Sequence, residues 1–477
     1  MDSNYSAIPR NNNSSIELQS HDRNNRAYGH SKIDGFYDDE DYALEEFDEL
    51  PLILVPDSES KDVGSGVPGA VFNLATSVIG AGIMALPAAM KVLGVAFGLF
   101  SIVVMGILSE ISIELLVRFS VLCKSSSYGD VVHSALGSFA RVVSEICIII
   151  NNAGILVVYL IIIGDVMSGS FEHVGVFEQL LGHGWWDNRK LVILIVLVVF
   201  LAPLCALQKI DSLSLTSAAS VALAVVFVVA SCVIASIKLV EGSIKTPRMG
   251  PDFGSKTAIL DLLVVIPIMT NAYVCHFNVQ PIYNELKGRS PHKMNRVGRI
   301  TTVLCVVVYA STALSGYLLF GDDTESDVLT NFDENLGIRF SFILNYVIRI
   351  GYVLHLVLVF PVIHFSFRQT VSELIFRTSV PQSRTITLAL TAVLLGIIYL
   401  GSTMIPNIWV AFKFTGATTG LALGFTFPSL VALRLDKQGK NLGRATRFSL
   451  WLMLVLAVIV SIIGVFGNIY SLKNQTG

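Results

Sequence analysis

The stretch that decides the fold spans residues 72–87 and reads FNLATSVIGAGIMALP. It lies in an apolar segment of about 20 residues, the length that a helix needs to cross a bilayer. Within it, Gly80 and Gly82 flank one alanine, and Pro87 follows. Glycine and proline weaken a helix, so we predict a membrane helix that is interrupted near its middle. Unwound backbone inside a membrane persists only where it lines a cavity or is buried in protein. The break therefore marks a candidate binding site.

The composition of the whole chain agrees with lipid as its solvent. Of the 477 residues, 53% are hydrophobic and 14% are charged, whereas a soluble domain has about 25% charged residues. The net charge of −3 argues against nucleic acid as a partner. The six cysteines lack metal-ligand spacing, and no nucleophile–base constellation or cofactor motif emerges. We therefore expect no metal site, no cofactor and no enzymatic activity, and the missing selectivity-filter repeat disfavours a channel.

Hydropathy predicts an all-α membrane protein with eleven transmembrane helices. Lys and Arg gather in the loops on the side of the N-terminal tail, while the loop at 321–337 on the other side carries only acidic charges. By the positive-inside rule the N-terminus is cytosolic, and an odd number of spans puts the C-terminus on the far side. The spans are expected at about 68–91, 94–117, 140–164, 190–206, 213–236, 258–279, 297–319, 339–364, 385–402, 407–432 and 447–470.

A second interrupted segment lies five spans later, where residues 265–277 read VIPIMTNAYVCHF. It holds Pro267 and a polar pair, Thr270 and Asn271. Two interrupted helices at equivalent places in two five-span halves predict an inverted repeat with a binding site at the membrane midplane. The alternative is that the glycines of the first segment serve only close helix packing. The transporter domain at 67–477 would hold repeat one at about 67–236, repeat two at about 257–435 and an extra helix at about 447–470.

Several of these segments resemble one family. The stretch 72–87 looks like the first span of the amino acid/auxin permease superfamily, and residues 128–130, 277–286, 414–418 and 427–428 resemble further motifs of it. The chain is most similar to plant vacuolar amino acid transporters and to the sodium-coupled neutral amino acid transporter branch. The resemblance implies the leucine-transporter fold, a five-plus-five inverted repeat plus one helix. It also implies symport of amino acids with Na⁺ or H⁺.

The resemblance also assigns a substrate site. Gly80, Ala81 and Gly82 would form the cradle for the substrate carboxylate, since an interrupted helix exposes backbone N–H groups and a positive dipole end. Span six would face the amino group and side chain of the substrate. The substrate-binding candidates are Thr76, Ser77, Gly80, Ala81, Gly82, Thr270, Asn271 and Asn152. Asn152 shares one face of span three with Glu145, and hydrogen bonding between helices is an equally good interpretation of that face.

The coupling ion follows from two positions. The sodium-using branch tends to place an asparagine at position 76 and a hydroxyl in the middle of span eight. Here residue 76 is threonine and residues 356–360 read LVLVF, without the oxygen ligands that a hard cation needs. We therefore expect H⁺ rather than Na⁺. The candidate proton carriers are His276, His355, Glu145 and Asp261, because ionisable groups inside a membrane are costly and often functional. A packed, hydrogen-bonded histidine is the plain alternative.

Two cations lie inside predicted spans, Arg349 in span eight and Lys413 in span ten. A buried cation needs an anionic partner, so a structural pair is the first interpretation. The second is that one of them attracts an acidic substrate side chain. Aspartate and glutamate would then join the neutral amino acids as substrates.

The first 66 residues differ in composition from the rest. They are polar and, from 34 to 49, strongly acidic, which predicts a disordered cytosolic tail without a cleavable signal peptide. Asp48, Leu52 and Ile53 form an acidic dileucine pattern, which a sorting adaptor would read. With the resemblance, it favours a vacuolar or other endomembrane and transport from lumen to cytosol. The alternatives are a sodium-coupled neutral amino acid symporter at the plasma membrane and a transporter-like amino acid sensor.

Overall fold

The computed structural model describes residues 64–475 except 171–172, 208–212, 334–335, 377–382, 406 and 439–441. These residues form helices and loops, with two isolated β-bridges and no strand, which confirms the predicted all-α fold class. The predicted tail, with the sorting residues Asp48, Leu52 and Ile53, lies outside the described residues.

Eight helical stretches in the described part of the chain are each long and apolar enough to cross a membrane. A bent pair of shorter helices, α2 (Val67–Val78) and α3 (Gly82–Leu93), makes a ninth when it is counted as one span. The eight are α4 (Val95–Leu122), α6 (Ser138–Ser168), α10 (Ser214–Val240), α13 (Pro291–Phe320), α14 (Ser341–Phe376), α15 (Arg384–Met404), the stretch from α16 (Ile408–Thr415) to α17 (Phe427–Lys437), and α18 (Arg444–Gln475).

Two of the predicted spans are helical but interrupted. The span at 190–206 consists of α8 (Arg189–Val196), a π-helical turn η2 (Leu197–Leu201) and α9 (Ala202–Cys205). The span at 258–279 consists of α11 (Lys256–Tyr273) and α12 (His276–Asn284). The remaining elements are α5 (Tyr128–Leu136), α7 (Val176–Leu181), η1 (Trp185–Asp187), η4 (Gly321–Asp323), η5 (Thr330–Asp333), and the π-helical turns η6 (Gly416–Gly420) and η7 (Ala422–Thr426) between α16 and α17.

The first predicted break is present. Helix α2 ends at Val78, α3 begins at Gly82, and their axes differ by 54°. The glycines are needed for packing here: a Cβ at Gly80 would collide with the hydroxyl of Tyr159, and one at Gly82 would lie 2.8 Å from the Cα of Ala272. Pro87 lies inside α3 rather than at the break.

The second break lies at 274–275, between α11 and α12. Pro267 stays inside α11, so the proline does not itself end the helix. Ala272, in the last turn of α11, is the residue that packs against Gly82 of the first break. The two interrupted helices therefore meet at their breaks.

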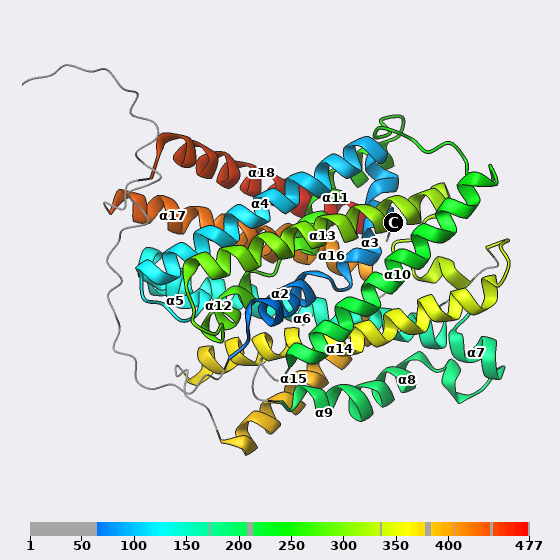
Figure 1. Ribbon diagram of the computed structural model, residues 1–477, viewed down its shortest axis with the longest axis horizontal. Coiled ribbons are helices and arrows are strands. Elements are labelled where there is room, and N and C mark those ends of the chain that lie inside the picture. The colour runs from blue at the N-terminus through cyan, green and yellow to red at the C-terminus, as the bar shows by residue number, and fades with distance from the viewer. Residues whose placement is uncertain are drawn as a thin grey trace, which may run out of the picture. The chain divides into compact units, whose positions relative to one another are not determined.

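Long helices surround the two breaks. Helix α13 packs against α2, α3 and α4, while α14 packs against α6 and α10, and Figure 1 shows α2 lying between α13 and α14. On the outside of these helices large apolar side chains are exposed, among them Phe100 at 66%, Val303 at 63% and Phe448 at 71%. An apolar surface of this extent is unfavourable in water, and it suits a lipid environment.

The two ends of the helical bundle differ in charge. We call the end that carries residues 321–340 the acidic-loop end, and the end that carries residues 285–296 the basic-loop end. Helix α13 runs from the basic-loop end to the acidic-loop end. The sequence predicts that the basic-loop end faces the cytosol.

Candidate functional site

The carbonyl groups that the first break frees are met by ring side chains. Tyr309 on α13 donates to the carbonyl of Val78 at 2.6 Å, and Tyr352 on α14 donates to that of Gly80 at 2.8 Å. Between them, the carbonyl of Ile79 faces the imidazole of His355, also on α14. Because a buried carbonyl without a partner is costly, these contacts stabilise the unwound segment.

Tyr309 also joins the two breaks. Its hydroxyl oxygen lies 2.7 Å from the carbonyl of Ala272 on α11, in addition to its contact with Val78. Tyr273, the last residue of α11, donates to the carbonyl of Ile102 on α4 at 3.0 Å and packs edge-on against the Tyr309 ring. The geometry of one break is therefore tied to that of the other.

The amide side of the first break is the predicted carboxylate cradle. Helix α3 begins there, and two N–H groups of its first turn donate to carbonyls of the break itself, that of Ile83 to Gly80 at 3.3 Å and that of Met84 to Ala81 at 3.1 Å. The hydroxyl of Tyr159 on α6 lies against Gly80 and hydrogen-bonds to the backbone of Ala81. A helix N-terminus of this kind suits an anion, and the Tyr159 hydroxyl occupies the place that a carboxylate oxygen would take.

The two hydroxyl residues before the break bind neighbouring helices. The Oγ1 of Thr76 lies 3.1 Å from both the carbonyl of Ser217 and the Oγ of Ser220 on α10. The Oγ of Ser77 donates to Asn73 and accepts from the Nδ2 of Asn278 on α12 at 2.8 Å. Both residues are buried and tie α2 in place; their predicted role in substrate binding stays a prediction.

Several buried polar groups of α6, α11 and α12 have no partner. Neither the oxygen nor the nitrogen of the Asn152 side chain is hydrogen-bonded, and the Oδ1 of Asn271 is unpaired although its Nδ2 donates to Thr415. Both nitrogens of His276, the first residue of α12, are also unpaired. Thr270, in contrast, donates to its own helix at Ile266. Since buried polar groups in proteins nearly always have partners, unpaired groups at a helix break fit a site for a polar ligand.

The other proton-carrier candidates lie in different surroundings. Glu145 accepts from Arg141 at 2.7 Å in an ion pair. Asp261 on α11 interacts electrostatically with Lys413 on α16. His355 is fully buried, and its Nδ1 lies 2.7 Å from the carbonyl of Ser220. The structure thus separates two candidates that face a cationic side chain, Glu145 and Asp261, from two buried histidines that face none among the described residues.

A cavity lies beside Glu145, toward the basic-loop end. It lies between α5, α6, α12 and α14 and has a volume of about 20 Å³, which is room for about one water molecule. Glu373 on α14 also lines it, and this carboxylate accepts from Gln369 at 2.9 Å.

The two predicted substrate-charge residues are engaged by the protein. Arg349 donates to Gln179 and to the carbonyls of Val166 and Val174 at 2.7–3.1 Å. Lys413 lies 5.8 Å above the ring of Trp409. Arg349 therefore ties α14 to the chain that follows α6, and its role toward a substrate stays a prediction.

The acidic-loop end is closed over α3. The N–H of Val328 donates to the carbonyl of Met84 at 3.2 Å, and Phe332 packs on Phe227 and is fully buried. Asp327 is buried in the same loop; burial raises the pKa of this carboxyl to about 7, although the Leu329 N–H donates to it. In the sequence these residues form an acidic loop, and their composition gives no indication that the loop packs over α3.

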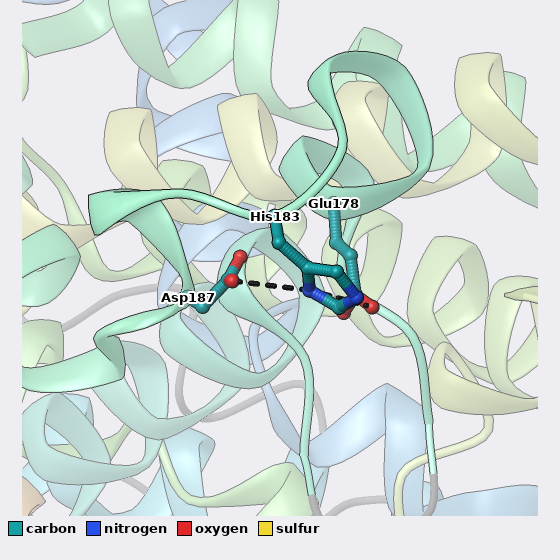
Figure 2. A group of neighbouring side chains, drawn as sticks. All are labelled: Glu178, His183 and Asp187. Atoms are coloured by element: carbon teal, nitrogen blue, oxygen red, sulfur yellow. Dashed lines mark hydrogen bonds and ion pairs between the residues drawn. The ribbon is translucent and has the colours of Figure 1, made fainter.

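A surface group lies on the connection from α7 to α8, where Figure 2 shows Glu178, His183 and Asp187 side by side. The Nδ1 of His183 lies 3.4 Å from Glu178 and 3.3 Å from Asp187, and the histidine side chain is 83% exposed. Both carboxylates share one imidazole nitrogen at the surface. These contacts account for the group as a surface ion-pair cluster outside the candidate site.

Comparison with known proteins identifies the family. Residues 64–470 match the family model described as transmembrane amino acid transporter protein. The chain is 65% identical to the amino acid transporter AVT6E of Arabidopsis thaliana over the full length of both proteins. It is 43% identical to AVT6A of the same plant over 88% of this chain and 93% of that protein.

Solved structures of transporters share the fold. A manganese transporter mutant from Eremococcus coleocola has a TM-score of 0.56 at 13% identity, covering 86% of this chain and 88% of that one. The nucleobase-cation-symport-1 family transporter MHP1 has a TM-score of 0.54 at 12% identity, with 87% and 94% covered. The relatives are transporters rather than enzymes, and the resemblance to the amino acid/auxin permease superfamily is confirmed. The chain is an integral multi-pass membrane protein that belongs to the transmembrane amino acid transporter family.

Proposed function

We propose that this protein is a proton-coupled secondary transporter that moves amino acids from the lumen of a vacuole or another endomembrane compartment to the cytosol. One observation carries the proposal: the two interrupted helices meet at their breaks, with Gly82 against Ala272. The unpaired, buried Oδ1 of Asn271 belongs to the last turn of α11, next to Ala272, and Asn152 on α6 is a further buried residue with an unpaired side chain. This is the arrangement expected of a binding site at the membrane midplane.

In this proposal the substrate carboxylate binds at the amide side of the first break. It displaces the Tyr159 hydroxyl from the backbone of Ala81. The carboxylate then lies at the N-terminus of α3, where the partial positive charge of the helix dipole stabilises an anion. The amino group then faces the unpaired Oδ1 of Asn271 and the amide of Asn152. Neutral amino acids satisfy these contacts. Acidic substrates would need a further cation, for which Lys413 is the better candidate because Arg349 is already bonded three times.

The proposed topology has eleven spans as two inverted halves of five plus one. Helices coincide with each of the eleven predicted segments, and the breaks fall in the first and the sixth. The loop charges favour a cytosolic basic-loop end. The cavity beside Glu145 lies toward that end, while the acidic-loop end is closed over Met84, which fits release toward the cytosol.

Flux through the purified protein in liposomes tests the proposal, with the twenty amino acids as competitors at two pH values. We expect Gly80→Ala to lower uptake at least ~10-fold, since even about 1.4 kcal/mol of lost binding gives that factor and the added methyl meets the Tyr159 hydroxyl. Gly396→Ala in α15 is the matched control, because a methyl there meets no neighbouring atom within 4 Å.

Two results would overturn the proposal. One is equal uptake by the Gly80→Ala and Gly396→Ala proteins. The other is a wild-type protein whose melting temperature rises with an amino acid while no flux occurs, which is the behaviour of a sensor.

A further inference from the structure

We propose that His355 carries the coupling proton, and that as an imidazolium it places a positive charge at the break of the first span. This inference rests on the proposed function and names the residue through which the transport site is coupled to protons. It selects one of four candidates that the sequence leaves equal.

Two backbone carbonyls face the ring of His355. Its Nδ1 lies 2.7 Å from the carbonyl of Ser220 on α10, and the carbonyl of Ile79 at the end of α2 faces the same ring. The side chain of the same Ser220 is bonded to α2, since its Oγ lies 3.1 Å from the Oγ1 of Thr76. The ring nitrogen Nε2 has no hydrogen-bond partner although the residue is fully buried.

The two carbonyl oxygens and the end of α2 favour a cation at His355. Helix α2 has 12 residues and ends at Val78, so its negative dipole end points at the place where Ile79 and His355 meet. The part of the chain that the structure describes places no carboxylate, ammonium or guanidinium group against the imidazole, and the titratable neighbour is Tyr352, 4.8 Å away between ring centroids. A proton on His355 is therefore held only by the carbonyls and the helix end.

A bound substrate would change that balance. Its carboxylate would sit at Ala81 and Gly82, on the other side of the same break, two or three residues from Ile79. The negative charge would stabilise an imidazolium at His355, and the imidazolium would in turn strengthen carboxylate binding. Because this coupling is reciprocal, substrate and proton bind together and leave together. A zwitterionic amino acid then crosses with one positive charge.

The other candidates have contacts that do not offer this coupling. Glu145 is held by Arg141, and Asp261 faces Lys413. His276 lies at the start of α12, where a helix N-terminus disfavours a cation. His364, nine residues after His355 on the same helix, is buried with both nitrogens unpaired. It faces Arg368, so it serves as the matched control.

The decisive experiment compares wild type, His355→Gln and His364→Gln in liposomes. Glutamine still donates to the Ser220 carbonyl but cannot carry the proton. We expect His355→Gln to lose concentrative uptake driven by an acidic outer solution while it keeps exchange of labelled for unlabelled substrate at equal pH. Wild-type substrate affinity should weaken at least ~5-fold from pH 5.5 to 7.5, whereas the affinity of His355→Gln should not change with pH. His364→Gln should behave like wild type.

The outcomes separate the two levels of the proposal. No exchange by the wild-type protein would defeat the transporter proposal itself, and wild-type uptake driven by a Na⁺ gradient alone would defeat proton coupling. Concentrative uptake by His355→Gln in an acidic gradient would overturn the role of His355 but leave the transporter proposal standing. If His276→Gln then lost concentrative uptake, the proton carrier would be His276. Proton uptake by detergent-solubilised wild-type protein on adding substrate gives a readout without any variant: its absence counts against coupling. His355→Asn replaces the glutamine variant if that protein does not purify as a single species.

Discussion

At the residue scale, rings and small side chains shape the site together. Tyr309, Tyr352 and His355 take the carbonyls of the first break, and Tyr159 lies at its amide side. Glycine is required at 80 because the Tyr159 hydroxyl fills the space of a side chain. The chemistry of the break thus depends on residues from three other helices.

A buried carboxyl at the acidic-loop end gives a pH prediction at this scale. Asp327 has one oxygen bonded to the Leu329 N–H and the other unpaired, and burial raises its pKa to about 7 from the usual 3.8. A raised folded-state pKa favours the protonated form, so the contribution of Asp327 to stability is lost as the pH rises from about 4 to about 7. We expect the melting temperature to fall over this range by a few degrees more in wild type than in Asp327→Asn.

Thermal unfolding followed by intrinsic fluorescence between pH 4.5 and 8 measures this difference. The exposed Asp323 in the same loop supplies the control variant, Asp323→Asn, which should keep the wild-type dependence. An identical pH dependence in wild type and Asp327→Asn would show that another group is responsible.

At the scale of elements, contacts between loops hold the acidic-loop end closed. His173 and Val174, after α6, both reach the carboxylate of Asp333 at 3.0–3.1 Å, and Gln179 of α7 donates to the Asp333 carbonyl. Arg349 of α14 binds the same segment at Val174 and Gln179. One arginine thus connects a span of the second proposed repeat to the chain that follows α6 in the first.

Replacing this arginine tests the connection. In Arg349→Lys the planar fork that reaches three acceptors is lost, and hydrogen bonds to charged groups contribute about 1.5–3 kcal/mol each. We expect a melting temperature several degrees lower, whereas Arg339→Lys at an exposed position should leave it unchanged. The competition profile should stay the same in both variants. A selective loss of competition by aspartate and glutamate in Arg349→Lys would instead support the substrate-charge hypothesis.

At the scale of the whole molecule, the number of spans fixes which termini share a compartment. With eleven spans and a cytosolic N-terminus, the C-terminus lies in the lumen. The spans at 190–206 and 258–279 decide this number, because both are interrupted and neither belongs to the eight long apolar stretches or to the bent pair of α2 and α3.

Protease protection of sealed endomembrane vesicles tests the topology. We expect an N-terminal epitope tag to be cleaved from outside and a C-terminal tag to be protected until detergent is added. A tag in the 438–443 connection, on the basic-loop side, is the control for cytosolic access. Cleavage of both terminal tags would mean an even number of spans.

The sequence by itself determined the long apolar helices and the first break. Crossing lipid requires about 20 apolar residues in a row, and Gly80 and Gly82 leave their mark in any helical pattern, so both could be predicted without tertiary contacts. The sequence also marked Pro267 to Cys275 for the second break. Only the tertiary structure placed that break at 274–275, where neither glycine nor proline stands, because contacts with Gly82 and Tyr309 hold the end of α11.

The tertiary structure also decided which polar residues are free to act. In the sequence Glu145, Asp261, His276 and His355 are equivalent ionisable residues in apolar spans. Packing pairs Glu145 with Arg141 four residues earlier, sets Asp261 before Lys413 and leaves the histidines without charged partners. The Glu145–Arg141 pair lies within α6, at the i, i+4 spacing of one helix. The facing of Asp261 and Lys413, in contrast, depends on which faces of distant helices meet, and that information is absent from the hydropathy of any one span.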